Sequence, residues 1–356
     1  KHLYSMITIL LGTLVMSVVL VTITLRVING ATPLSVFVFI WSSTQSLHAT
    51  LGGTLRSIAQ QNEFALYAAD MYAVRDATPE AVRRNDSIVC ADRIPEIVFE
   101  HVAFQYPFDK KGREILQDIS FKIRPGERLA LVGCNAAGKT TIVRLICGIY
   151  EPTKGRILVD GVDLKEIDIN SWRKQLSVLF QNYAQYNIIV REVIALGDTK
   201  CEPTDEHIAE AANQSGVDKF VADLPDGYKT QIGKDFKDGI EPSGGQNQRI
   251  ALARVAYRQG KVVILDEPTA SLDAFAEAEI FEELEHHSGR STLILITHRF
   301  STIKIADHIV VLDHGKIIEE GSHTSLMRNN GLYADMYLKQ ARGYMDQPID
   351  IDKEEG

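Results

Sequence analysis

The sequence is poor in cysteine and has no surplus of basic residues. Its 356 residues include 38 Lys and Arg against 47 Asp and Glu, which gives a net charge of −9. A protein that wraps nucleic acid needs clustered basic side chains against the phosphate backbone, so we expect no nucleic-acid partner. The few cysteines show neither metal-ligand spacing nor a paired framework, which favours free thiols in a reducing compartment. They are Cys90, Cys134, Cys147 and Cys201.

Charge is missing altogether from residues 3–25, a stretch long enough to cross a bilayer once. A second apolar stretch begins at Pro33. We therefore expect a partial transmembrane domain over residues 1–75, with helices at 3–28 and 33–58. Polar residues in the second stretch would face either a neighbouring helix or an aqueous substrate path, and the sequence leaves both alternatives open. These residues are Ser42, Ser43, Thr44, Gln45, Ser46, His48 and Thr50.

The second helix is expected to extend beyond the membrane, because no Pro or Gly occurs from Thr54 to Ala77. A helix from Pro33 to Arg75 would be about 65 Å long, roughly twice a hydrocarbon core of about 30 Å. Its second half should therefore project into the cytosol. Basic residues are denser before the first stretch and after the second than in the turn between them. By the positive-inside rule, this distribution places both chain ends in the cytoplasm.

The rest of the chain has a different pattern. Residues 76–93 lack apolar periodicity and are interpreted as a linker. Over residues 94–342, strand-like apolar runs alternate with helical patterns, which is typical of an α/β domain with a mostly parallel sheet and an antiparallel β portion near its start. Residues 343–356 form an acidic C-terminal tail.

A phosphate-binding loop is predicted at GCNAAGKTT, which follows an apolar strand and opens a helical pattern. Its glycines allow backbone N–H groups to curl around phosphates, and the helix start adds a favourable field. We expect Lys139 to reach the β- and γ-phosphates of ATP and Thr140 to bind Mg²⁺. The predicted ATP-binding residues of the loop are Gly133, Cys134, Asn135, Ala136, Ala137, Gly138, Lys139, Thr140 and Thr141.

An acidic pair ends the apolar run VVIL, later in the chain. Asp266 is expected to hold Mg²⁺, directly or through water, and Glu267 to polarise the water that attacks the nucleotide. Together with the phosphate loop, this pair predicts an ATP-hydrolysing site.

A second helix start, SGGQ, has the form of a phosphate-binding loop but no lysine. It consists of Ser243, Gly244, Gly245 and Gln246. We expect Ser243 to cap the helix. Pro242 would then cost no helical hydrogen bond and would bias the preceding residue toward an extended conformation.

The phosphate loop, SGGQ and ILDEP in this order resemble the nucleotide-binding domain of ATP-binding cassette (ABC) transporters. The resemblance implies an α/β P-loop NTPase cassette with a helical subdomain, which binds ATP and Mg²⁺. It also implies that Tyr106 stacks on adenine and that Gln181 touches Mg²⁺ and senses the membrane domain. Asp273 would face the partner subunit, and His298 would lie near the γ-phosphate as a catalytic residue beside Glu267 and Gln181.

The N-terminal part resembles the last two membrane helices of an exporter-type half-transporter, of which four further helices are not found in this sequence. We therefore interpret the chain as the C-terminal part of a longer transporter of the cell membrane. In this family two cassettes meet head-to-tail, and each SGGQ loop contacts the ATP held by the partner. The resemblance thus implies a second half-transporter subunit, identical or different, and an unidentified exported substrate. Two alternatives stay open: a non-transport ABC ATPase, and a truncated regulatory or inactive fragment.

Pro242 departs from the family pattern, which usually has leucine at this position. Because proline removes one apolar anchor ahead of the SGGQ loop, we expect normal local geometry with altered coupling or turnover.

Overall fold

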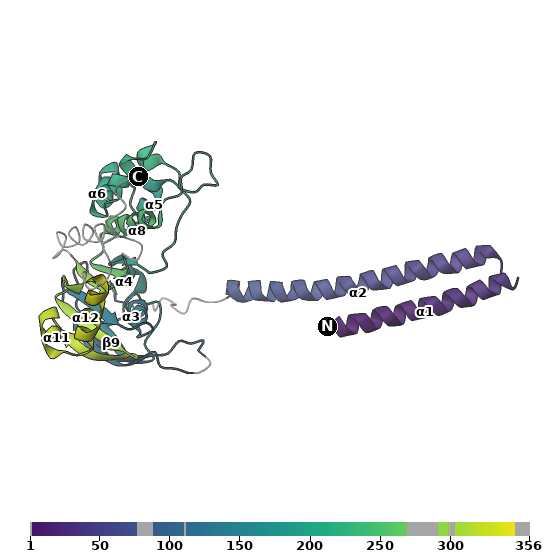
Figure 1. Ribbon diagram of the computed structural model, residues 1–356, viewed down its shortest axis with the longest axis horizontal. Coiled ribbons are helices and arrows are strands. Elements are labelled where there is room, and N and C mark those ends of the chain that lie inside the picture. Colours follow the sequence, from purple (N-terminus) through teal and green to yellow (C-terminus); the bar gives the residue numbers. More distant parts are fainter. Residues whose placement is uncertain are drawn as a thin grey trace. The chain divides into compact units, whose positions relative to one another are not determined.

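The computed structural model describes residues 2–76, 88–109, 112–268, 291–297, 299 and 303–345. The chain folds into two compact units, Lys1–Val82 and Arg83–Gly356 (Figure 1).

The N-terminal unit is a helical hairpin of α1 (His2–Ile28) and α2 (Leu34–Asp76). The turn between them uses Gly30 at a φ of 68°, in the left-handed region that glycine adopts without strain. Gly12 of α1 lies so close to His48 of α2 that a Cβ there would come within 3.0 Å of the imidazole Cε1. A small residue on α1 therefore allows the two helices to approach.

Hydroxyl groups on α2 bond to the carbonyls of their own helix. Thr44 donates to Ile40 at 2.7 Å, and Thr50 donates to Ser46 at 2.8 Å. These side chains therefore need no partner from another helix to satisfy their donors. In the part of the chain that the structure describes, no helix combines the length and the apolar character needed to cross a membrane.

The first sheet of the C-terminal unit is antiparallel, with strand order β2-β1-β4-β5. Buried and exposed residues alternate along much of β2, because one of its faces packs on the core. The strands are β1 (Ile97–Phe104), β2 (Leu116–Ile123), β4 (Lys154–Val159) and β5 (Val162–Asp163).

The second sheet has the order β10-β9-β3-β8-β7-β6, in which β10 alone pairs antiparallel. All five residues of β8 are buried, since both faces of this central strand are covered. The strands are β3 (Arg128–Gly133), β6 (Leu176–Leu179), β7 (Val262–Asp266), β8 (Thr292–Ile296), β9 (His308–Asp313) and β10 (Lys316–Gly321). The predicted α/β fold with a mostly parallel sheet and an antiparallel portion is confirmed.

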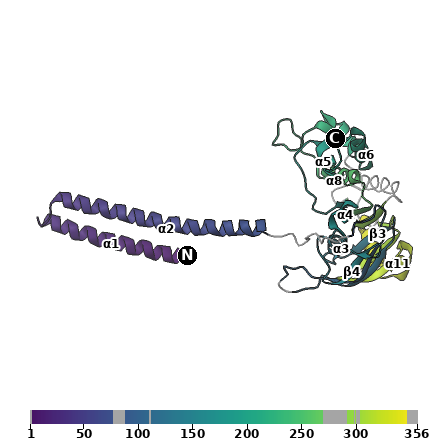
Figure 2. The ribbon, with the colours of Figure 1, turned by 180° about the vertical axis from the view of Figure 1, so that it is seen from behind.

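Helices pack on these sheets and also form a separate group, in which α5, α6 and α8 lie together in both views (Figures 1 and 2). This group, with α7, encloses its own core of Val193, Ile208, Val217, Ile250 and Tyr257. The helices are α3 (Lys139–Ile146), α4 (Ile169–Lys174), α5 (Val190–Ala195), α6 (Asp205–Gln214), α7 (Val217–Ala222), α8 (Gly244–Arg258), α11 (His323–Asn329) and α12 (Leu332–Met345), with a 3₁₀ turn at Gly227–Lys229.

The segment interpreted as a linker is partly attached to the C-terminal unit. The backbone N–H of Ile88 donates to Glu166, and that of Cys90 donates to the Ser171 hydroxyl at 2.9 Å. Residues 77–87 of this segment, and residues 346–356 of the expected acidic tail, lie outside the described residues. All four cysteines are free thiols, as expected.

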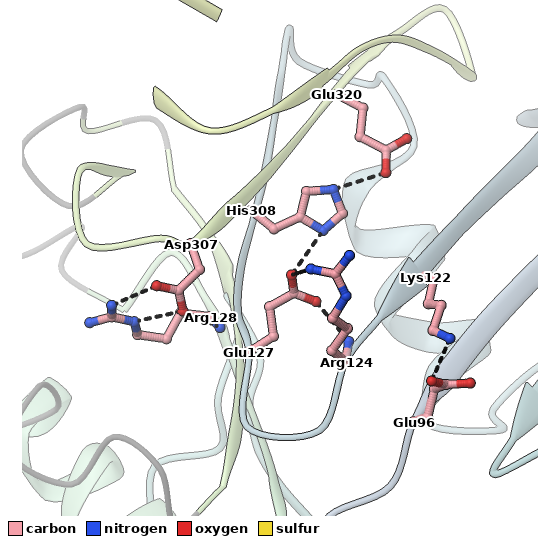
Figure 3. Close-up of polar contacts among 8 residues, drawn as sticks. All are labelled: Glu96, Lys122, Arg124, Glu127, Arg128, Asp307, His308 and Glu320. Atoms are coloured by element: carbon pink, nitrogen blue, oxygen red, sulfur yellow. Dashed lines mark hydrogen bonds and ion pairs between the residues drawn. The ribbon is translucent and has the colours of Figure 1, made fainter. Parts of the chain in front are cut away.

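Ion pairs fasten the amino ends of β3 and β9, at the end of the sheet opposite to Gly133 (Figure 3). The Arg128 guanidinium donates to both carboxylate oxygens of Asp307, at 3.0 and 2.7 Å. His308, beside Asp307, contacts Glu320 of β10 at 2.9 Å. Exposed pairs of this kind contribute little free energy. They connect residues at or beside one end of β3, β9 and β10.

Arg258, the last residue of α8, joins the helical group to the sheet. Its guanidinium donates to three backbone carbonyls: Leu176 at 2.5 Å, Gly197 at 3.0 Å and Arg173 at 2.8 Å. These oxygens belong to β6, to the segment just after α5 and to α4. Because arginine presents several donors in a fixed planar fork, one side chain can hold all three elements together.

We predict that Arg258→Met lowers the free energy of unfolding by about 2–4 kcal/mol. The substitution removes the charged donor from three backbone carbonyls and leaves them without a hydrogen-bond partner. Urea unfolding followed by circular dichroism measures the change. Arg328→Met makes the same substitution in the last turn of α11 at an exposed site, and its unfolding midpoint should stay close to that of the unmodified chain. Equal midpoints for the two variants would contradict the bridging role of Arg258.

Candidate functional site

The predicted phosphate loop connects β3 to α3 at the carboxyl edge of the parallel sheet. Gly133 has a φ of 152°, and a Cβ at this position would collide with the carbonyl oxygen of Leu312 in β9. Gly138 caps α3 in the left-handed region, with a φ of 106°. Both glycines are therefore required by backbone conformation and close packing, and together they bend the chain into a loop at the helix start.

Lys139 lies inside this loop. Its ammonium donates to the carbonyls of Gly133 at 2.6 Å and Cys134 at 3.0 Å, and only 7% of the residue is exposed. Burial lowers the pKa of Lys139, while the negative charges of Glu267 and Asp266 oppose this shift. The loop therefore encloses a positive charge with few water contacts, which suits it to bind anionic phosphates.

Asp266 ends β7 beside the phosphate loop and is only 2% exposed. The Thr140 hydroxyl donates to its Oδ2 at 3.1 Å. Burial raises the pKa of Asp266, and the hydrogen bond from Thr140 acts in the opposite direction. Thr140 and Asp266, both predicted to hold Mg²⁺, are thus joined by a hydrogen bond between their side-chain oxygen atoms.

The oxygen atoms of Thr140 and Asp266 fit the mode in which proteins usually hold Mg²⁺. This ion takes hard oxygen ligands and is commonly bound by one or two carboxylates together with substrate phosphates and water. Among the described residues, no group of three or more His, Cys, Asp or Glu side chains forms an all-protein metal site. A single buried carboxylate with an adjacent hydroxyl agrees with an ion shared between protein and nucleotide.

Glu267 follows Asp266 with a φ of 53°, in the left-handed region. Its N–H donates to Ile296 of β8 at 2.8 Å, and Nε2 of Gln181 donates to its Oε2 at 2.9 Å. Nε2 of Gln248, on α8, donates to the backbone carbonyl of Glu267 at 3.3 Å. The structure thus brings together the predicted residues Gln181 and Glu267 and adds Gln248, which the sequence analysis missed.

Tyr106 lies against α3. Its hydroxyl is 3.1 Å from Oγ1 of Thr141 and accepts a hydrogen bond from Arg144 at 2.8 Å. Its ring packs edge-on against Phe104 and Tyr150. The structure therefore places Tyr106 next to the phosphate loop, while its stacking on adenine stays a prediction.

The SGGQ segment starts α8 with a reciprocal pair of hydrogen bonds. Ser243 caps the helix, as predicted, and its hydroxyl accepts from the N–H of Gln246 at 3.3 Å. The Gln246 side chain accepts from the N–H of Ser243 at 2.8 Å. The S-x-x-Q spacing is the sequence signal of this capping box. Pro242 is buried, and its carbonyl accepts from the Asn247 amide at 3.0 Å, so the proline leaves the helix start intact.

Comparison with known proteins agrees with this geometry. The family model described as ABC transporter matches residues 116–270, which contain the phosphate loop, the SGGQ segment and the Asp266–Glu267 pair. This chain carries the cassette of an ABC transporter. The resemblance noted in the sequence is thereby confirmed.

The proteins to which this chain is similar include a flippase and an exporter. It is 39% identical over 269 residues to an ATP-dependent lipid A-core flippase of Legionella pneumophila (strain Lens), covering 75% of this chain and 44% of the flippase. It is 38% identical over 258 residues to ABC transporter B family member 1 of Arabidopsis thaliana, covering 72% of this chain and 20% of the plant protein. The solved structure of a bacterial Atm1-family ABC exporter with ATP bound is similar at a TM-score of 0.71 and 33% identity. The similarity covers 87% of this chain and 53% of the exporter chain. The chain spans less than half the length of the flippase.

Two residues expected in the cassette site cannot be placed. Asp273 and His298 lie outside the described residues. The geometry of the site therefore rests on the phosphate loop, Gln181, Asp266 and Glu267.

The buried carboxyl group of Asp266 predicts a pH-dependent gain in stability for Asp266→Asn. The pKa of this acid is higher in the folded chain than its ordinary value of 3.8, so its ionisation opposes folding as the pH rises through the raised pKa. Asparagine removes this cost. Thermal unfolding should show a higher midpoint for the variant at neutral pH, with a gain that disappears as the pH falls below the ordinary value.

Asp335→Asn is the matched control, because the Asp335 side chain is exposed and forms a surface ion pair with Lys339 on α12. Its midpoint should differ little from that of the unmodified chain at either pH. An Asp266→Asn variant that is less stable at neutral pH than at acid pH, relative to the unmodified chain, would refute the effect of burial.

Proposed function

We propose that this chain is the ATP-binding and ATP-hydrolysing subunit of an ABC exporter. In this proposal, closure of two cassettes around ATP, followed by hydrolysis, drives export of an unidentified substrate. One observation carries it: Lys139, Asp266 and the Gln181–Glu267 pair converge at the carboxyl edge of a single parallel sheet. These are the charges and donors that nucleotide hydrolysis requires.

Nucleotide binding is assigned to the phosphate loop. Backbone N–H groups of residues 133–141 surround the phosphates, Lys139 neutralises their charge, and Tyr106 stacks on the adenine. Mg²⁺ would be held by Thr140, Asp266 and Gln181. When bound, it neutralises charge on the phosphate oxygens.

Hydrolysis is assigned to Glu267, which orients the attacking water. Nε2 of Gln181 donates a hydrogen bond of 2.9 Å to Oε2 of Glu267, which orients the carboxylate. His298 would contact the γ-phosphate as the second catalytic residue. A preorganised group of this kind lowers the barrier because little reorganisation is needed at the moment of reaction.

The SGGQ loop is assigned to the ATP of a second subunit. Ser243 and the N–H groups of Gly244 and Gly245 present neutral donors and the positive end of α8 to the partner's γ-phosphate, beside Gln246. A lysine in this loop would add a permanent positive charge to the interface, whereas neutral donors make closure depend on the nucleotide. Asp273 would face the partner cassette. The partner is a second half-transporter subunit, identical to this chain or different from it.

The N-terminal hairpin is assigned to the membrane domain of the exporter, with the cassette in the cytoplasm. Support comes from the uncharged residues 3–25 and from apolar side chains that the hairpin exposes, which would contact lipid or further helices. Examples are Val15, Val18, Val21, Leu25, Ile28 and Phe39. The relatives named as lipid A-core flippases make a lipid substrate one option, and the substrate of this chain stays unidentified.

A groove beside β6 is assigned to contact with the second half-transporter subunit. It has a volume of about 320 Å³ and lies between the end of α3 and the end of α8. Exposed Ile149 and Leu196 line it, together with Arg173, Arg254 and Arg258. Because β6 leads directly into Gln181, a segment seated in this groove would act close to the hydrolytic carboxylate.

We predict that Glu267→Gln retains ATP binding and loses hydrolysis, since glutamine keeps the shape of the side chain but cannot accept the water proton. Titration with a fluorescent ATP analogue and release of inorganic phosphate measure the two properties. Lys139→Ala should instead weaken ATP binding itself, because it removes the ammonium that contacts the phosphates. Phosphate release close to the unmodified rate in Glu267→Gln would refute the assignment of Glu267.

A further inference from the structure

The backbone of Glu267 is held in a conformation that residues other than glycine rarely adopt. Its φ of 53° lies in the left-handed region, which costs free energy for an L-amino acid with a Cβ. Such a conformation persists where the surroundings enforce it. Among the described residues, two hydrogen bonds act on this backbone: Glu267 donates from its N–H to Ile296 and accepts at its carbonyl from Gln248.

Gln248 is a buried side chain on a firmly packed helix. It is 2% exposed, and its Nε2 donates to the Glu267 carbonyl at 3.3 Å. The apolar face of α8 packs against the strands that carry the site, in a cluster with members on β6, β7 and β8. These members are Leu179, Ala251, Leu252, Val255, Leu265, Leu293 and Leu295. A donor on this helix is therefore held next to β7, and a small shift of the helix would move the donor relative to Glu267.

The same helix also begins with the SGGQ loop. Ser243 caps α8, and Gln248 follows five residues later, about 7–8 Å along the helix axis at the usual rise per residue. The helix thus presents its N-terminus at the site assigned to the partner's ATP, and presents Gln248 to the backbone carbonyl of Glu267 in its own subunit.

We propose that Gln248 is a positioning residue for hydrolysis. By donating to the carbonyl of Glu267 it holds the left-handed backbone, and with it the direction of the carboxylate toward Gln181. Through Gln248, docking of the SGGQ end of α8 onto one ATP changes the geometry of the carboxylate that serves the other ATP. This inference rests on the proposed role of Glu267.

The test uses Gln248→Met in the full chain, because methionine has a similar size and no amide donor. We expect kcat for ATP hydrolysis to fall on the order of 10- to 100-fold, the loss typical of a misplaced catalytic group, while affinity for a fluorescent ATP analogue stays the same. The Hill coefficient for ATP should fall toward one. Gln214→Met is the matched control: this glutamine lies on α6 and donates to Glu210, and its kcat and Hill coefficient should not change.

A double-mutant cycle separates positioning from a general effect on the fold. If Gln248 acts through the Glu267 carboxylate, then Gln248→Met should lower the residual rate of the Glu267→Gln variant little further. Gln248→Glu provides a second variant, which keeps size and polarity but lacks the donor at neutral pH, and its kcat should also fall. A crystal structure of either variant should show Glu267 outside the left-handed region.

The inference is overturned if Gln248→Met and Gln248→Glu both hydrolyse ATP at the unmodified rate. It is also overturned if Gln248→Met lowers the rate by the same factor with Glu267 and with Glu267→Gln. Failure of the proposed function gives a different result, since Glu267→Gln would itself then hydrolyse ATP at the unmodified rate.

Discussion

The site depends on burial of opposite charges at the carboxyl edge of one parallel sheet. Lys139 and Asp266 are nearly inaccessible to water. Burial lowers the pKa of Lys139 and raises the pKa of Asp266, which in both cases favours the neutral side chain. Loop carbonyls accept from the ammonium, and Thr140 donates to the carboxylate. Buried charges are tolerated only with such partners, so the glycine-rich loop and the strand end constrain each other. A charged, anionic ligand with a divalent cation suits these groups better than an apolar one.

Helix α8 connects this charged edge to the rest of the cassette. Its first residue is capped by Ser243, its second turn carries Gln248 to the Glu267 carbonyl, and its last residue is Arg258, which donates to three carbonyls. Apolar side chains along one face hold it against the sheet. A helix fixed at several points moves as a unit. A displacement at its SGGQ end would therefore reach both Glu267 and the groove beside β6.

Motifs with a local mechanism were predictable from the sequence. The phosphate loop, the Asp266–Glu267 pair and the Ser243 cap depend on residue types at short, fixed spacings, and the structure forms each of them locally. The alternation of strands and helices, with a mostly parallel sheet and an antiparallel portion, was predictable from apolar runs and helical patterns. The contact of Gln248 with Glu267 and the bridge made by Arg258 were not predictable, because each joins residues of different elements, and a glutamine or arginine on a helix is most often solvated. The family resemblance assigned Tyr106 to stacking on adenine, whereas the contacts of its hydroxyl with Thr141 and Arg144 were not predictable from the sequence.

In the proposed mechanism, the SGGQ loop of one chain serves the ATP of another. Mixing two inactive variants tests it most directly: Lys139→Ala, defective in the phosphate loop, and Gly244→Asp, whose added carboxylate suits a helix start but repels phosphates. In a dimer of two copies of this chain, one of the two partners that the proposal allows, a mixed dimer combines the intact phosphate loop of one variant with the intact SGGQ loop of the other. ATP hydrolysis should then reappear on mixing. A mixture that stays as inactive as its two components would contradict the account.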